Sequence, residues 1–242
     1  DENGFERKRN FMIQISNLSK KYGETVVFSD LNYTFENACI YGLVGRNGAG
    51  KTTLLNILSN YDKNYTGVIS IDRKKMNKVD YLDMPVAYAM DQPSFFNELT
   101  IYENLLLIAS SRKIKKQEAF DKIERILDGL GLKKYENYSP LELSKGTMQR
   151  LNNACAMIQE EKITIFDEPF SGLDPVQMKL LENVIVEFHK KEKGIYIISS
   201  HDIECLQNVC DKCLLLHNGQ IREINMEEVD REEIAKILSE GE

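Results

Sequence analysis

A phosphate-binding loop is predicted by nine consecutive residues. They are Gly45, Arg46, Asn47, Gly48, Ala49, Gly50, Lys51, Thr52 and Thr53, and they fit the pattern Gly-x4-Gly-Lys-Ser/Thr. Glycines let backbone N–H groups curve around phosphate oxygens, and a helix opening at Thr52 adds partial positive charge. Lys51 would reach the β- and γ-phosphates of a nucleotide, and the Thr52 hydroxyl would coordinate Mg²⁺. A glycine-rich turn with an incidental lysine is the alternative, but the flanking strand and helix patterns favour phosphate binding.

Two adjacent acids supply the second chemical element. Asp167 and Glu168 directly follow an apolar run at residues 163–166. A strand there would deliver Asp167 to the carboxyl edge of a sheet, where Mg²⁺ would lie beside the phosphates. Glu168 would orient and deprotonate an attacking water. Solvated acids are common at strand ends, so the pair predicts hydrolysis only in combination with the phosphate loop.

The elements that must position these residues alternate in type. Short apolar runs occupy residues 40–44, 163–166, 195–198 and 213–216, and helical patterns lie between them, at 52–58 and 175–190 for example. Strands of a parallel sheet, which are covered on both faces, show such runs. The alternation therefore predicts an α/β fold with a parallel sheet. Together with the phosphate loop, this arrangement resembles the core of a phosphate-loop (P-loop) NTPase.

Two regions interrupt this alternation. Residues 11–39 alternate apolar and polar side chains, which predicts a small antiparallel β subdomain, and residues 94–156 show helical spacing, which predicts a helical insertion. The core would then comprise residues 40–93 and 157–226, within one domain spanning 11–242. Residues 1–10 are expected to be a tail, and residues 227–242 a terminal helix.

Further motifs stand before, between and after the two phosphate-related elements. Residues 143–150, Leu-Ser-Lys-Gly-Thr-Met-Gln-Arg, resemble the Leu-Ser-Gly-Gly-Gln signature of the ATP-binding cassette (ABC) ATPases, and the resemblance covers nearly the whole chain. The other matching positions are Tyr22, Gln92, the loop Ser171, Gly172, Leu173 and Asp174, and His201.

The resemblance implies a role for each of these residues. Tyr22 would stack on adenine, Gln92 would ligate Mg²⁺ or the attacking water, and His201 would bind the γ-phosphate. The implied catalytic residues are thus Glu168, His201 and Gln92, and the implied Mg²⁺ ligands are Thr52, Gln92 and Asp167. A core tyrosine, an ordinary loop amide and a structural histidine are the respective alternatives for Tyr22, Gln92 and His201.

The signature would act on a second copy of the cassette. Ser144, Lys145, Gly146 and Thr147 would complete the ATP site of that copy, with Ser171–Asp174 as the dimer loop, so the resemblance implies a head-to-tail homodimer or heterodimer with a second ABC ATPase. Lys145 replaces a usual glycine and Thr147 a usual glutamine. We expect the signature to be competent; a degenerate signature with weak ATPase activity is the alternative.

A metal site is a further possibility near the C-terminal end of the core. His201, Cys205, Cys210, Cys213 and His217 fall close together in sequence. They lack a second close cysteine pair of the kind that zinc sites use. Buried small thiols are the expected reading.

Composition and charge limit the partners. The chain has 31 Lys+Arg and 38 Asp+Glu, a formal charge of −7, which argues against broad binding to nucleic acid or anionic lipid. No apolar run approaches the roughly 20 residues of a membrane helix. Five cysteines, an odd number, indicate free thiols in a reducing compartment. We expect a protein of the cytoplasm, peripheral on the cytoplasmic face of the cell membrane.

The resemblance implies the nucleotide-binding subunit of an ABC transporter, of the bacterial exporter type. With Mg²⁺, it would bind and hydrolyse ATP to power export of a peptide, drug or lipid-like substrate through membrane-spanning permease subunits. Phe95 and Phe96 are expected to contact such a subunit, with core packing as the alternative. One rival is a soluble ABC ATPase acting on ribosomes or nucleic acid, although no nucleic acid partner is expected. Another is a non-enzymatic nucleotide-binding module, which the Asp167–Glu168 pair disfavours.

Overall fold

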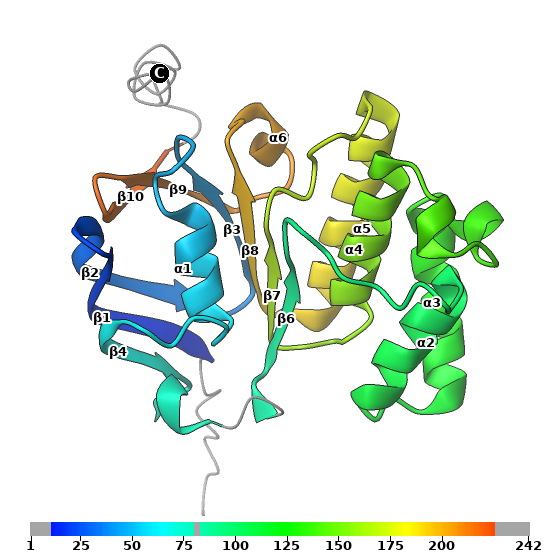
Figure 1. The fold of residues 1–242 in the computed structure, drawn as a ribbon, viewed down its shortest axis with the longest axis horizontal. Coiled ribbons are helices and arrows are strands. Elements are labelled where there is room, and N and C mark those ends of the chain that lie inside the picture. Colours follow the sequence, from blue (N-terminus) through cyan, green and yellow to red (C-terminus); the bar gives the residue numbers. More distant parts are fainter. Residues whose placement is uncertain (1–10, 80–82, 226–242) are drawn as a thin grey trace, which may run out of the picture.

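Two sheets lie on either side of helix α1 (Lys51–Leu58), as Figure 1 shows. The computed structural model describes residues 11–79 and 83–225, so the tail and terminal helix predicted for residues 1–10 and 227–242 lie outside the described residues. The larger sheet has six strands in the order β10-β9-β3-β8-β7-β6. Its members are β3 (Cys39–Val44), β6 (Val86–Ala89), β7 (Ile163–Phe166), β8 (Ile195–Ser200), β9 (Lys212–His217) and β10 (Gln220–Ile224).

The larger sheet confirms the predicted parallel core. All neighbouring strands from β9 to β6 run parallel, and only β10 is antiparallel, paired to β9 as a hairpin. Parallel strands share one carboxyl edge, so the loops that follow β3, β6, β7 and β8 meet there. Strands β6 and β10 were not predicted. The first is only four residues long, and the second carries charged side chains on an exposed edge.

The smaller sheet is antiparallel and has four strands in the order β2-β1-β4-β5. Their bounds are β1 Met12–Tyr22, β2 Thr25–Glu36, β4 Thr66–Ile71 and β5 Lys74–Lys75. The predicted boundary of the β subdomain at residue 39 is therefore corrected. Strands β4 and β5 belong to the antiparallel sheet, although the sequence analysis assigned their residues to the core. Pairs such as Ile13 with Ile71 and Ile15 with Ile69 join segments far apart in sequence, and a local pattern does not reveal such partners.

Alternate residues of the core strands face two different hydrophobic clusters. One cluster contains Tyr41, Leu43 and Ile165 with α1 and the antiparallel sheet, whereas the other contains Ile40 and Phe166 with the remaining long helices. Those helices are α2 (Ile101–Ser111), α3 (Lys116–Gly129), α4 (Lys145–Met157) and α5 (Pro175–Glu192). The described residues also include a short helix α6 (Glu204–Gln207) and the 3₁₀ turns Met76–Lys78, Lys133–Tyr135 and Pro140–Glu142.

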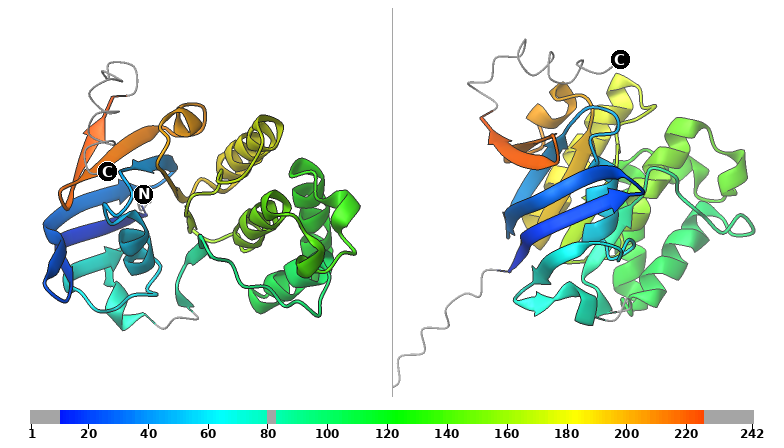
Figure 2. Two further views of the ribbon diagram at one scale, coloured as in Figure 1. Left: turned by 45° about the horizontal axis from the view of Figure 1, so that its top comes forward. Right: turned by 60° about the vertical axis from the view of Figure 1, so that its left-hand side comes forward.

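The helices predicted within residues 94–156 are present as α2, α3 and α4. Figure 2 shows α2 and α3 gathered at the end of the molecule opposite the antiparallel sheet. Helix α4 contacts α2 and α3 but also packs on β6 and β7. It therefore belongs to the core as much as to the insertion, and it joins the two.

Candidate nucleotide site

The phosphate loop runs from the end of β3 into α1. Gly48 and Gly50 have φ angles of 77° and 100°, a left-handed region that glycine adopts without strain. A Cβ on Gly50 would also lie 2.7 Å from Val27 Cγ1. Gly50 precedes α1 and gives it no side-chain cap, so the first N–H groups of the helix can serve an anion.

Lys51 is held at the base of this loop. It is only 7% exposed, and its Nζ donates to the carbonyl oxygens of Gly45 at 2.6 Å and Arg46 at 3.4 Å. The same Nζ lies 3.6 Å from Glu168 Oε1. The ammonium group therefore lies between the phosphate loop and the acid that follows β7.

Asp167 is buried at the carboxyl end of β7. Its Oδ1 accepts from Ser199 Oγ at 2.5 Å, and its Oδ2 accepts from Tyr88 Oη at 3.4 Å. Burial raises the pKa of this carboxyl, and hydrogen bonds from Ser199 and Thr52 lower it. The effect of burial is larger, so the pKa lies above its ordinary value. A buried carboxylate joined to the Thr52 hydroxyl offers hard oxygen donors, which fit Mg²⁺.

Glu168 faces the cavity with a strained backbone. Its φ of 49° is left-handed, and the turn is held because its N–H donates to Ser199 Oγ at 2.9 Å. Its Oε2 lies 2.9 Å from Nδ1 of His201, which follows the neighbouring strand β8. Glu168 thus touches a lysine on one side and a histidine on the other.

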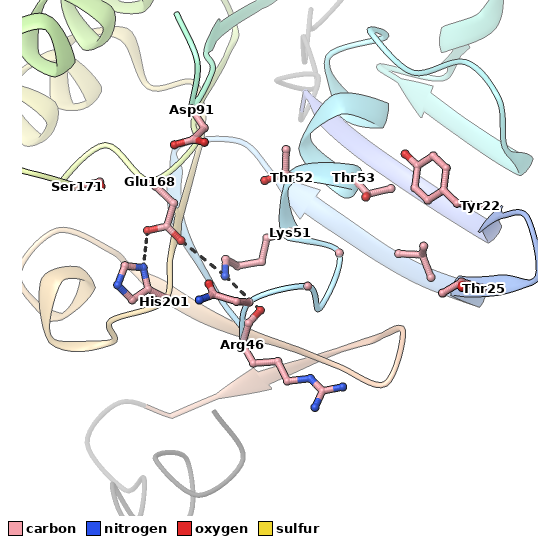
Figure 3. Close-up of a pocket in the computed structure, with 14 residues that line it drawn as sticks. Tyr22, Thr25, Arg46, Lys51, Thr52, Thr53, Asp91, Glu168, Ser171 and His201 are labelled. Atoms are coloured by element: carbon pink, nitrogen blue, oxygen red, sulfur yellow. Dashed lines mark hydrogen bonds and ion pairs between the residues drawn. The ribbon is translucent and has the colours of Figure 1, made fainter. Parts of the chain in front are cut away.

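These residues line one open cavity of about 530 Å³. Figure 3 shows the acids and His201 at one end, Lys51 and Thr52 in the middle, and Tyr22 at the other end. The predicted residues that line it are Tyr22, Arg46, Asn47, Gly48, Gly50, Lys51, Thr52, Thr53, Glu168, Ser171 and His201. The structure adds Thr25, Val27 and Asp91, which sequence reasoning missed. Gly45, Ala49 and Asp167 are not lining residues, although all three belong to the same two loops.

Tyr22 lies at the end of β1 and is 52% exposed, so it is not a core tyrosine. Its hydroxyl donates to Asp62 Oδ2 at 3.1 Å, and Lys20 Nζ lies 4.5 Å from its ring centroid. Asp62 also forms a 2.7 Å ion pair with Lys20. An aromatic ring held in this way is suited to stack on a base.

Gln92 does not reach the cavity. It is exposed and is absent from the lining, whereas its neighbour Asp91 lines the cavity. The role of Gln92 in binding Mg²⁺ or the attacking water therefore stays a prediction.

The signature residues lie outside this cavity, at the start of α4. Ser144 is the N-cap of α4, and its Oγ accepts from Thr147 N at 3.2 Å. A Cβ on Gly146 would lie 3.0 Å from the carbonyl oxygen of Gly172, so the signature packs closely on the predicted dimer loop. The exposed side chain of Lys145 extends over Gly172. Within one copy, Ser144 and Lys145 present their side chains to the surface.

The predicted dimer loop also starts a helix. Asp174 caps α5, because its Oδ1 accepts from Gln177 N at 2.9 Å. Gly172 has a φ of 73°, and Leu173 is partly buried against the helical cluster. Ser171 N donates to the Glu168 carbonyl at 3.1 Å, so the loop follows directly from the acidic pair.

The cysteines of the predicted thiol cluster lie in different elements. Cys205 lies in α6, Cys213 lies in β9, and Cys210 lies in the connection between them. The five cysteines are free thiols. Within residues 11–79 and 83–225, no group of three or more His, Cys, Asp or Glu side chains could hold a metal ion.

Comparison with known proteins decides the family. The sequence profile of the ABC transporter family matches residues 28–171, more than half of the chain. The chain belongs to the ABC transporter family and is an ATPase. It is 32% identical over 208 residues to an uncharacterized ABC transporter ATP-binding protein of Methanocaldococcus jannaschii, covering 86% of this chain and 75% of the relative.

Relatives of this ABC ATPase serve transporters of more than one kind. It is 30% identical to the bacitracin transport ATP-binding protein BcrA of Enterococcus faecalis, covering 91% of this chain and 71% of BcrA. It is also 30% identical to the tungstate uptake protein TupC of Peptoclostridium acidaminophilum, covering 87% and 97%. A solved ATP-binding subunit of an ABC transporter superposes with a TM-score of 0.81 at 27% identity, covering 93% of this chain and 94% of that one. No helix among the described residues is long and apolar enough to span a membrane.

Proposed function

We propose that this ABC ATPase binds Mg²⁺-ATP in the cavity and hydrolyses it with Glu168 as the general base. The observation that carries this proposal is the position of Glu168, 3.6 Å from Lys51 Nζ and 2.9 Å from His201 Nδ1. Lys51 would hold the β- and γ-phosphates, and His201 would orient the carboxylate and the γ-phosphate. Glu168 would take a proton from the attacking water.

Thr52 and Asp167 would hold the Mg²⁺, which, when bound, offsets the charge of the phosphates. The Thr52 hydroxyl is hydrogen-bonded to the buried Asp167 carboxylate, so these two oxygen donors lie next to each other. Tyr22 would stack on the base at the other end of the cavity.

A second cassette would complete the site. Ser144 and Lys145 are exposed at the helix start, away from the cavity of their own copy. In a head-to-tail dimer, the helix N-terminus, the Ser144 hydroxyl and the Lys145 ammonium would all favour the γ-phosphate of the other copy. Whether the second cassette is the same chain or a related one does not alter this geometry.

The hydrolysis proposal is tested with Glu168→Gln, which keeps the shape and removes the base. Turnover should fall by about 10²–10⁴ while ATP still binds, and an ATP-loaded dimer should accumulate in sizing chromatography with Mg-ATP. Lys51→Ala is the matched comparison, because it should lose nucleotide affinity itself. A Glu168→Gln variant that hydrolyses ATP normally overturns the assignment, and one that stays monomeric overturns the dimer.

We further propose that the protein works on the cytoplasmic face of the membrane and drives membrane-spanning permease subunits. Phe96 and Leu141, named here the apolar rim, are exposed large apolar side chains. Their segments are joined because Ser139 Oγ donates to the Asn97 carbonyl at 2.8 Å. A short amphipathic helix of a membrane subunit suits such a rim.

Export of a peptide, drug or lipid-like substrate is the direction we favour, supported by the likeness to the bacitracin transport protein. The likeness to the tungstate uptake protein supports import instead. Reconstitution with the permease in vesicles separates them: ATP supplied outside inverted vesicles should load an exporter's substrate into the lumen. ATP-driven release of substrate from the lumen to the outside, with no uptake into the lumen, would assign import.

A further inference from the structure

A second cavity, of about 550 Å³, lies beside the end of the β1–β2 hairpin. It is named here the hairpin groove, and its lining includes Lys20, Lys21, Val26, Phe28 and Tyr65. Among the described residues, none lines both the hairpin groove and the nucleotide cavity. Small-molecule sites occupy roughly 300–1,000 Å³. The hairpin groove is therefore a separate space that is large enough for a small ligand.

The groove lies where β1 loses one of its two partner strands. Strand β1 pairs with β4 only as far as Ser19, which lies opposite Thr66, whereas its pairing with β2 continues to the end of the hairpin. The residues before Thr66 are not paired with β1. Lys20 joins the two segments instead, because its Nζ donates to the Asn64 carbonyl at 2.6 Å. This change from strand pairing to a single side-chain bond leaves the space beside β1.

A β-bulge in β2 divides the hairpin between the two cavities. Lys20 pairs with Phe28 and Lys21 pairs with Val26, so Val27 has no partner on β1. Val27 lines the nucleotide cavity, whereas Val26 and Phe28 line the hairpin groove. The hairpin that carries the predicted base-stacking ring therefore also forms part of a second site.

The lining of the groove combines apolar side chains with one available positive charge. Val26 is 63% exposed, although it is a large apolar residue. The charge of Lys20 is offset by its 2.7 Å ion pair with Asp62. Lys21 is exposed and forms no ion pair within residues 11–79 and 83–225. None of the described lining residues is acidic, so the groove presents the charge of Lys21 beside apolar surface.

Tyr65 adds a hydrogen-bond donor to this lining. Burial raises the pKa of Tyr65, and the negative charge of Asp62 raises it further. The hydroxyl therefore stays protonated at neutral pH and can donate to an anionic group.

We propose that the hairpin groove binds a small amphipathic anion, whose apolar part packs on Val26 and Phe28 and whose charged group pairs with Lys21. Covering the exposed Val26 side chain removes apolar surface from water, which favours binding. The charge of Lys21 favours an anion over a neutral molecule of the same size. Neither contact involves nucleotide, so this inference stands or falls independently of the proposed hydrolysis.

The probe for the test is the fluorescent anion anilinonaphthalene sulfonate, which binds exposed apolar surface. A saturating non-hydrolysable ATP analogue is present throughout, so that the nucleotide cavity is filled. Lys21→Glu and Val26→Asp should each weaken binding of the probe about tenfold, whereas Lys21→Arg, which keeps the charge, should retain it. The matched controls are Lys74→Glu on β5 and Val68→Asp on β4. Both residues are exposed on the same sheet and do not line the groove, so neither change should affect the probe.

Competition against the probe identifies the chemistry that the groove selects. Decanoate should displace the probe, and decanol, which has the same chain without the charge, should displace it about tenfold less well. Acetate, which has the charge without the chain, should not displace it. Equal displacement by decanoate and decanol would show that the groove does not select an anion and would overturn the inference.

Three further results would also overturn the inference. Unchanged probe binding in both Lys21→Glu and Val26→Asp would place the probe elsewhere on the protein. Loss of probe binding on addition of the ATP analogue would place it in the nucleotide cavity. If Val26→Asp instead removes a dimer that forms without nucleotide in sizing chromatography, a second copy of the chain covers the groove. An unchanged affinity of Val26→Asp for ATP shows that the variant is folded, because Val26 does not line the nucleotide cavity.

Discussion

The hydroxyl oxygens of Ser144 and Thr147 lie 2.8 Å apart at the start of α4. Thr147 is 3% exposed, and its Oγ1 also accepts from Arg150 Nη2 at 3.3 Å. Arg150 Nη1 in turn donates to the Leu130 carbonyl, just beyond α3, at 2.6 Å. The residue that replaces the usual glutamine therefore connects the exposed Ser144 hydroxyl to the rest of the helical insertion.

Removing the Thr147 hydroxyl should disorder the Ser144 side chain without opening a cavity. Thr147→Val keeps the shape and leaves Arg150 and Ser144 each without one hydrogen bond, at a cost of about 1–3 kcal/mol. We expect kcat to fall about tenfold, with a smaller change in the affinity of the monomer for ATP, because Ser144 would act on the other copy. Steady-state hydrolysis measures kcat, and calorimetry measures the affinity for ATP.

Thr147→Ser is the matched control, since it keeps the hydroxyl and loses one methyl group. It should retain most of the kcat even though its melting temperature falls, because the lost methyl group was buried. Equal kcat for Thr147→Val and the unchanged protein would show that Thr147 only fills space.

Tyr22 should contribute to the binding of the base and not of the phosphates. Tyr22→Ala should weaken ATP binding about 10–100-fold and leave the affinity for inorganic tripolyphosphate unchanged, since that ligand has no base. A stacking ring does not read hydrogen-bonding edges, so GTP should compete well with ATP. Calorimetric titration with the three ligands checks this, and a parallel loss for tripolyphosphate would mean that the loop itself had moved.

Asp62 should hold the Tyr22 ring in place through its hydrogen bond to the Tyr22 hydroxyl. Asp62→Asn removes the charge that pairs with Lys20 and weakens the bond to the Tyr22 hydroxyl. The expected loss of ATP affinity is smaller than for Tyr22→Ala, again with no effect on tripolyphosphate. Tyr22→Phe, which keeps the ring and loses the hydroxyl, should match Asp62→Asn; a full loss in Tyr22→Phe would assign the hydroxyl a direct contact with nucleotide.

His189 should make the fold sensitive to mild acid. Burial lowers its pKa below the ordinary 6.5; the bond of its Nε2 to the Gly194 carbonyl at 3.2 Å opposes this, but burial wins. The unfolded chain therefore takes up a proton as pH falls below 6.5, while the folded chain stays neutral until its lower pKa is reached. Stability is lost across that interval and is fully present above it.

His189→Gln should flatten this part of the pH dependence. Urea unfolding at about pH 7.5 and about pH 5.5 gives the free energy of unfolding for both proteins. The unchanged protein should lose more stability between these values than the variant, although the variant starts lower because a packed ring is removed. Equal losses would show that His189 is protonated in the folded state as easily as in the unfolded chain.

The sequence predicted the phosphate loop and the acidic pair because each is contiguous and lies directly after one core strand. It did not predict that Thr66–Ile71 pairs with β1, since that partner lies far away in the chain. It also placed Gln92 in the site where the structure places Asp91. The direction of a loop residue depends on where the strand ends and on the Asn152 bond to Met90, and neither is visible in a local pattern.

The two phenylalanines predicted at the partner surface have different environments. Phe96 is 59% exposed, whereas Phe95 packs against the helical core. The backbone of Phe96 is fixed, because its N–H donates to Asn104 Oδ1 and its carbonyl accepts from Asn104 Nδ2, both at 3.0 Å. Asn104 itself is buried. The exposed ring is therefore presented from a rigid loop, which lowers the entropy lost when a partner binds.

Phe96→Asp should prevent assembly with the membrane subunit and leave basal ATP hydrolysis unchanged, because the ring is exposed and lies outside the nucleotide cavity. Phe120→Asp is the matched control: Phe120 is 47% exposed on α3, and its change should affect neither assembly nor hydrolysis. Phe95→Asp should lower the melting temperature, since it places a charge among packed apolar side chains. Co-purification from detergent and the hydrolysis rate give the result. Assembly that survives in Phe96→Asp would move the docking site away from the apolar rim, and loss of assembly in Phe120→Asp alone would place it on α3.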